Sequence, residues 1–94
     1  MTEDVLAPLR AMFRERSRHD LIILRKALMT RPPADPELER TVHGLAGSAG
    51  IFGHADIGAA ALALDADFAA GRPPDEHRLQ ALVALLEALP GMTG

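Results

Sequence analysis

The sequence contains no cysteine, tryptophan or tyrosine, and its only aromatic side chains besides histidine are three phenylalanines. The absence of cysteine excludes disulfides, cysteine-based zinc sites and cysteine nucleophiles. It also agrees with a reducing compartment, so we expect a cytoplasmic protein. The scarcity of aromatic and β-branched runs argues against β-sheets. These absences leave a helical domain as the expected class.

Concentrated positive charge and long apolar runs are also missing. Lys26 is the only lysine, the formal net charge is -3, and no basic stripe of the nucleic-acid-binding kind is present. No apolar run approaches the roughly 18 residues of a membrane span. The acidic start, MTEDVLAP, lacks the basic-then-apolar order of a signal peptide. We therefore expect neither nucleic acid nor membrane among the partners.

Alanine and leucine are abundant, and proline and glycine divide the chain into four amphipathic segments. The pattern predicts helices at about 4–29, 36–52, 56–70 and 75–90. The charged stretch RERSRHD leaves a break or kink near Ser17 open. The 94 residues suffice for one small domain. We predict a single all-α domain over residues 1–94, an antiparallel up-and-down four-helix bundle.

Helix ends and buried stripes can also be predicted. Asp35, Asp56 and Asp75 are the expected N-caps, and Gly53 is the expected stop of the second helix. The residues predicted to form the buried stripes are Leu6, Leu9, Phe13, Leu21, Leu24, Leu28, Leu38, Val42, Leu45, Ala49, Phe52, Ile57, Ala61, Leu64, Phe68, Leu79, Leu82, Leu86 and Leu89.

Residues 43–53, HGLAGSAGIFG, combine one histidine with four glycines. At about 100° per residue, His43 lies about 140° from the centre of the predicted core face, so we expect it in solvent. The residues that share its face are Arg40, Ala46, Gly47 and Gly50. The histidine is therefore expected to stand on a nearly bare surface.

Glycine inside a helix is unfavourable. Gly44, Gly47 and Gly50 together cost about 3 kcal/mol relative to alanine, which is large beside the roughly 5–15 kcal/mol that stabilises a domain. One physical reason for them is access, because without Cβ atoms another surface can approach the imidazole closely. Two alternatives stay open: tight packing of this helix on another, and an ordinary surface histidine at position 43.

The stretch resembles the signature of histidine-containing phosphotransfer (HPt) domains, roughly H-x-L-K-G-[SA]-[SA]-x-x-[FLM]-G on the second helix of a four-helix bundle. The positions that match are His43, Leu45, Gly47, Ser48, Ala49, Phe52 and Gly53. The family usually has a basic residue three positions after the histidine, where this chain has Ala46. We hypothesise that Arg40, on the same face, supplies the positive charge.

The resemblance implies a phosphoryl carrier of a two-component phosphorelay, not an enzyme with its own ATP site. His43 would accept the group, and the partners would be receiver domains of response regulators or a hybrid histidine kinase. No cofactor or metal is expected on this chain, and Mg²⁺ would come with the receiver. Gly44, Ala46, Gly47 and Gly50 would give the partner clearance, and Ile51 would contribute to docking. We expect a monomer.

Other candidate residues carry weaker signals. His19, His54 and His77 lack metal-ligand spacing. His54 follows the turn at Gly53, which leaves a place on the surface of His43 open as an alternative. Asp65 and Asp67 do not share a helix face, so they do not predict an acid/base pair. Arg14, Arg16 and Arg18 predict a solvated face. The alternative function is a non-phosphorylated helical binding or dimerisation module. The sequence predicts a stand-alone protein, with a domain of a hybrid kinase as the alternative.

Overall fold

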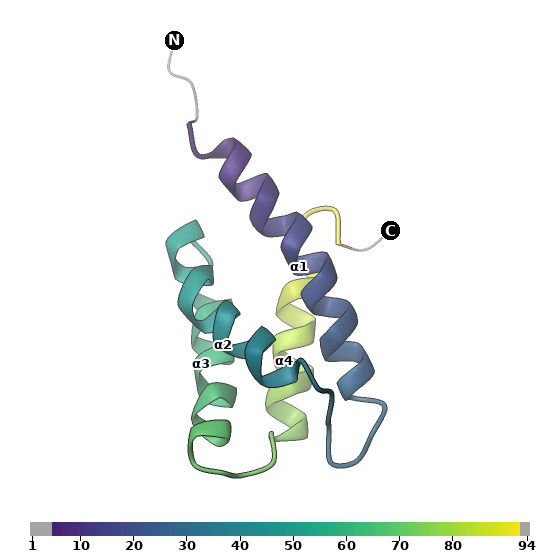
Figure 1. Ribbon diagram of the computed structural model, residues 1–94. Coiled ribbons are helices and arrows are strands. Elements are labelled where there is room, and N and C mark those ends of the chain that lie inside the picture. The colour runs from purple at the N-terminus through teal and green to yellow at the C-terminus, as the bar shows by residue number, and fades with distance from the viewer. Residues whose placement is uncertain (1–4, 93–94) are drawn as a thin grey trace.

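The computed structural model describes residues 5–92, which form four α-helices, one short 3-10 helix and no strand (Figure 1). The elements are α1 (Ala7–Ala27), α2 (Leu38–Ser48), η1 (Ala49–Phe52), α3 (Ala55–Ala69) and α4 (Glu76–Glu87). The all-α prediction is confirmed for this part of the chain. The predicted helix start near position 4 lies outside the described residues.

The four helices share one hydrophobic core. Helix α2 packs on α3, α3 packs on α4, and α1 contacts both α2 and α4. Leucines from every helix are buried there, among them Leu24, Leu45, Leu64 and Leu79. Burial of these amphipathic faces is the main stabilising term in a domain of this size. The antiparallel up-and-down arrangement stays a prediction.

Helix α1 is continuous, so the break considered near Ser17 is wrong. Ser17 is fully buried on the same stripe as Phe13 and Leu21. Most of the charged side chains around it leave the helix on its outer side, where water solvates them. The segment RERSRHD is therefore compatible with an unbroken amphipathic helix.

Leu6 and Leu9 were predicted to be buried, and this is wrong. They are 51% and 43% exposed. Figure 1 shows the reason, because the N-terminal end of α1 extends past the other helices. Phe52, Phe68 and Leu28 are half-buried and pack against the rim of the core. The remaining predicted core residues are buried.

Two of the three predicted N-caps are wrong. Asp75 caps α4, because its Oδ1 accepts a hydrogen bond from the backbone N–H of Arg78 at 2.9 Å. Asp35 instead accepts from the backbone N–H of Glu37 in a turn that precedes α2. Asp56 lies inside the first turn of α3 and accepts from the adjacent N–H of Ile57. Short side chains in such turns bond to whichever backbone donor is near, which moves a helix start by one or two residues.

The second helix was predicted to run from 36 to 52, but it is α-helical only over Leu38–Ser48 and ends in the tighter turn η1. Gly53 closes that turn with φ +85°, a left-handed conformation that suits glycine. This part of the prediction is confirmed. The chain reverses at Gly53 and enters α3 two residues later.

Candidate functional site

His43 lies on the outer face of α2, and its side chain is 78% exposed. Its neighbours Val42 and Leu45 are buried, so the helix is anchored on the opposite side. The predicted exposure of the histidine is thereby confirmed. An imidazole held in water on a well-packed helix is accessible to a reactant on another molecule.

Asp65 of α3 orients the His43 ring. The Nδ1 atom of His43 lies 3.2 Å from Oδ2 and 3.3 Å from Oδ1 of Asp65. An ionised carboxylate can only accept a hydrogen bond, so Nδ1 donates and carries the proton. In the neutral ring the lone pair then belongs to Nε2, on the edge turned away from the carboxylate. The arrangement favours the tautomer in which Nε2 carries the free lone pair.

From the sequence we considered Asp65 only as a partner of Asp67 in an acid/base pair, so its contact with His43 was not predicted. The two aspartates do face different surroundings, as expected, because Asp67 is buried among arginines elsewhere. The spacing around the turn at Gly53 could have predicted it, because His43 precedes that turn by about as many residues as Asp65 follows it. Helices that reverse at a tight turn bring such positions together.

Arg40 lies near the start of α2 with a side chain that is 80% exposed. Its Nη2 donates to Oε1 of Glu37 at 3.0 Å, so part of its charge is already balanced. The sequence did not predict this ion pair.

Five residues were predicted for partner clearance or docking, and three of them are exposed in the structure. Gly47 and Gly50 are exposed, and a Cβ added at either would meet nothing within 4 Å. Ile51 is 77% exposed. Ala46 was expected on the bare face but is half-buried against the core, because that flank of α2 packs inward.

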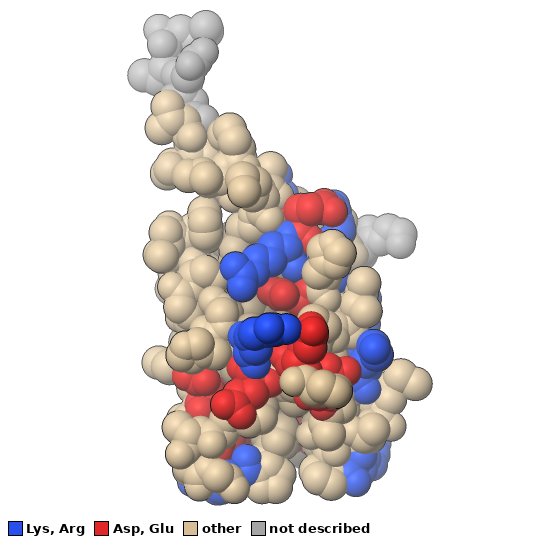
Figure 2. Space-filling view, viewed as in Figure 1, with Lys and Arg blue, Asp and Glu red and all other residues tan. Residues whose placement is uncertain are grey.

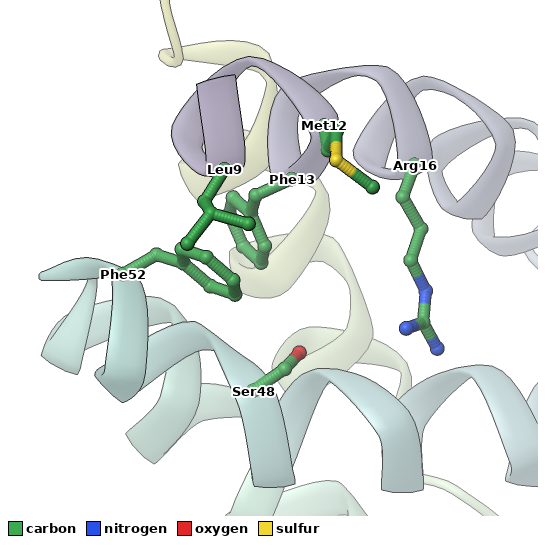
Figure 3. Close-up of a pocket in the computed structure, with 6 residues that line it drawn as sticks. All are labelled: Leu9, Met12, Phe13, Arg16, Ser48 and Phe52. Carbon is green, nitrogen blue, oxygen red and sulfur yellow. The ribbon is translucent and has the colours of Figure 1, made fainter. Parts of the chain in front are cut away.

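Gly44 differs from Gly47 and Gly50, because a side chain of another helix occupies its flank. A Cβ added there would lie 2.8 Å from Nη2 of Arg16. Arg16 belongs to α1, and Figure 3 shows its side chain extending from α1 toward α2. The sequence predicted only a solvated face for Arg16, since nothing local indicates what an extended arginine will reach.

Two adjoining hollows of about 220 and 310 Å³ lie between α1 and the end of α2. The first is lined by Leu9, Met12, Phe13, Arg16, Ser48 and Phe52 (Figure 3). The second shares Leu9 and Phe52 and extends to Ile51. The surface between the start of α1 and η1 is therefore apolar and open.

Phe13 lies between two other rings, which fixes the position of His54. Its ring centroid is 5.1 Å from that of Phe52 and 5.3 Å from that of His54, and both pairs are stacked. His54 is half-buried in this stack. It is therefore a packing residue at the start of α3, and the stack ties η1 and α3 to α1.

The charges on the surface are mixed. Figure 2 shows arginine or lysine side chains next to aspartate or glutamate side chains at the middle of the face viewed there. Within residues 5–92, no group of three or more histidine, aspartate or glutamate side chains is arranged to hold a metal ion. None of the helices described is both long enough and apolar enough to cross a membrane.

Fold and site together define a small helical domain with one exposed, carboxylate-oriented histidine on its second helix. The chain matches the family described as Hpt domain over residues 8–91, and it belongs to that family. Comparison with curated proteins and with solved structures found no significant match. Hpt domains are phosphocarrier modules without an ATP site of their own, and they act with receiver domains and histidine kinases in phosphorelays.

Proposed function

We propose that His43 is the phosphoacceptor of this Hpt domain, and that residues 1–94 form a single domain that presents it. The observation that carries the proposal is the pairing of a 78% exposed imidazole with a carboxylate 3.2 Å from its Nδ1. Exposure admits the partner, and the carboxylate leaves Nε2 as the free nucleophile. His19 and His77 are exposed too, but within residues 5–92 no carboxylate is hydrogen-bonded to the ring of either one.

The reaction is the transfer of a phosphoryl group from an aspartyl phosphate of a receiver domain. Nε2 of His43 attacks phosphorus in line, so an N–P bond forms as the P–O bond to the aspartate breaks. The aspartate leaves as a carboxylate anion, and no proton has to leave Nε2. Mg²⁺ belongs to the receiver. Reversal of the same step passes the group on.

Asp65 acts as a positioning residue in this step. The ring gains positive charge when Nε2 binds phosphorus while Nδ1 keeps its proton. The Asp65 carboxylate stabilises that charge from 3.2 Å. This is the role a carboxylate plays behind the histidine of a catalytic triad, where it holds the tautomer and the developing imidazolium.

The open helix face suits an approaching receiver. Gly47 and Gly50 present bare backbone, and Gly44 and Ala46 add only small surfaces. Ile51 and the apolar hollow beside it extend this face toward α1 and supply area for docking. Small residues near the reacting atom and apolar residues at a distance allow close approach without blocking the imidazole.

Arg40 contributes positive potential near the phosphoryl group. Its ion pair with Glu37 cancels part of this effect, so we expect its contribution to be small. The partners are receiver domains of response regulators or a hybrid histidine kinase, and the domain acts as a cytoplasmic monomer. These assignments rest on the sequence and on the family.

Incubation of the purified chain with phosphorylated receiver domains tests the proposal. We expect an acid-labile label that is lost in His43→Ala and kept in His77→Ala, a matched substitution of another exposed histidine. No label from any receiver would favour the helical binding or dimerisation module instead.

A further inference from the structure

We propose that Arg16 of α1 binds the phosphoryl group on His43 and so takes part in the site from a different helix. The inference rests on the function proposed above. It concerns the positive charge that stabilises the phosphorylated state. The sequence analysis considered only Arg40, in α2, for this role.

Gly44 provides the first argument, because it directly follows His43 and leaves a space that the Arg16 guanidinium fills. A Cβ at position 44 would lie 2.8 Å from Nη2 and 3.9 Å from Cζ of Arg16, the nearest atoms outside its chain neighbours and the backbone of α2. An alanine at this position would therefore force the guanidinium to move. The missing side chain of Gly44 allows Arg16 to rest against α2 beside the histidine.

The orientation of His43 provides the second argument. Helices α1 and α3 both contact α2, and Arg16 of α1 reaches the flank of Gly44, the residue that follows His43. Asp65 holds Nδ1 from α3. The Nε2 edge of the ring is consequently turned away from the carboxylate. We infer that a phosphoryl group on Nε2 comes within reach of the long Arg16 side chain, which ends beside Gly44. This separation keeps the negative charge of the phosphoryl group away from Asp65.

The charge of Arg16 is also available. Among the described residues, Arg16 forms an ion pair with Asp20. The Nε atom of Arg16 lies 4.0 Å from Oδ2 of Asp20, which is beyond hydrogen-bond distance. Arg40 differs, because it donates to Glu37 at 3.0 Å. The Arg16 side chain is 61% exposed, so it is free to follow the phosphoryl oxygens. A phosphoryl group carries a charge of about −2, and the planar guanidinium fork matches its oxygens.

Phosphoramidate, a small phosphoryl donor, allows the inference to be tested without any receiver. Nε2 of His43 attacks phosphorus, the N–P bond to the ring forms, and the P–N bond of the donor breaks. Ammonia leaves with a proton taken from the medium. The ³¹P resonance of the product is then followed against pH in the intact chain. A nearby guanidinium favours the dianionic phosphoryl group over its protonated form.

We expect the phosphoryl group of Arg16→Gln to bind its proton about fivefold more tightly than that of the wild type, as for one partly exposed ion pair. Gly44→Ala should act in the same direction, because its Cβ displaces the guanidinium. In the Arg16→Gln background Gly44→Ala should have no further effect. Arg14→Gln is the matched control, since it removes the same charge about 160° around α1 and should change nothing.

The outcomes separate the two proposals. A wild-type chain that phosphoramidate does not label at His43 contradicts the proposed function. A labelled wild type whose ³¹P titration is the same as that of Arg16→Gln overturns the role of Arg16 and leaves the function intact. Additive effects of Arg16→Gln and Gly44→Ala would also overturn it, because the glycine would then act independently of the guanidinium.

Discussion

The Nδ1 atom of His43 lies 3.2 Å from the Asp65 carboxylate, across the contact between α2 and α3. Every chemical property that we assign to the histidine depends on this relationship. It orients the ring and favours the tautomer with the lone pair on Nε2, and in the proposed reaction it balances the charge of the phosphorylated ring.

Replacement of Asp65 should slow phosphoryl uptake. Asp65→Ala removes both the acceptor and the charge, and we expect the rate of labelling at His43 to fall about tenfold, as when a metal-binding histidine loses the carboxylate that holds its other nitrogen. Asp65→Asn keeps an acceptor oxygen without the charge, so its labelling rate should lie between those of the wild type and Asp65→Ala. The ¹⁵N shifts of the His43 ring should show a mixture of tautomers in Asp65→Ala. Wild-type shifts and rates in that variant would contradict the positioning role.

Glycine at position 47 should lower the stability of the fold but favour phosphoryl transfer from a receiver. Gly47→Ala adds a Cβ that meets nothing within 4 Å, so it should raise the free energy of unfolding by about 0.8–1 kcal/mol through helix propensity. Denaturant titration measures this gain. Gly47→Leu should fold normally yet slow transfer from a receiver, whereas Ala59→Leu, on an exposed site of α3, should not. Equal transfer rates in the two leucine variants would remove the argument for clearance.

Asp67 should make the fold sensitive to acid. It is 2% exposed, and burial acts to raise its pKa, but the backbone N–H of Asp75 and the guanidinium groups of Arg72 and Arg78 outweigh this, so the pKa is lowered from 3.8. Because the folded-state pKa is below the unfolded one, the stabilisation is complete above pH 3.8 and is lost as the pH falls through the folded-state pKa.

We therefore expect Asp67→Asn to destabilise the protein at pH 7 by about 1–3 kcal/mol, the usual effect of losing hydrogen bonds to a buried charged group. Urea titrations of both proteins should converge as the pH falls below 3.8. A difference that is constant with pH would mean that packing, and not ionisation, accounts for the loss.

Ionised Asp20 should destabilise the fold, whereas ionised Asp67 stabilises it. Burial raises its pKa, with Arg16 and His19 opposing the shift, and its Oδ2 has no hydrogen-bond partner within residues 5–92. A raised folded-state pKa means that ionisation of Asp20 lowers the free energy of unfolding. The loss is complete above that pKa, shrinks as the pH falls below it, and is gone below the ordinary pKa of 3.8. Asp20→Asn should therefore be slightly more stable than the wild type at pH 7. A less stable variant in thermal unfolding would contradict this.

Much of the fold and the position of His43 could be predicted from the sequence, because both follow from helical periodicity. The stripe through Val42 and Leu45 determines which face of α2 is buried, and His43 is exposed as a consequence. Gly53 and Asp75 were predicted correctly because a left-handed turn and an N-cap are local requirements.

The rest depends on how the helices are placed in space. The exposure of Leu9 depends on how far α1 extends past its neighbours. The contact of Asp65 with His43 and the contact of Arg16 with Gly44 join residues of different helices. Periodicity within one helix carries no information about such contacts, so the sequence assigned the supporting charge to Arg40, the candidate within α2.

The most direct test of the account is to locate the phosphoryl group on the labelled chain. After reaction with phosphoramidate or with a phosphorylated receiver, ³¹P–¹⁵N correlation should place phosphorus on Nε2 of His43, while Nδ1 still carries its proton. His43→Ala should remain unlabelled under the same conditions. Phosphorus on Nδ1, on another histidine, or on His43→Ala would contradict the central claim.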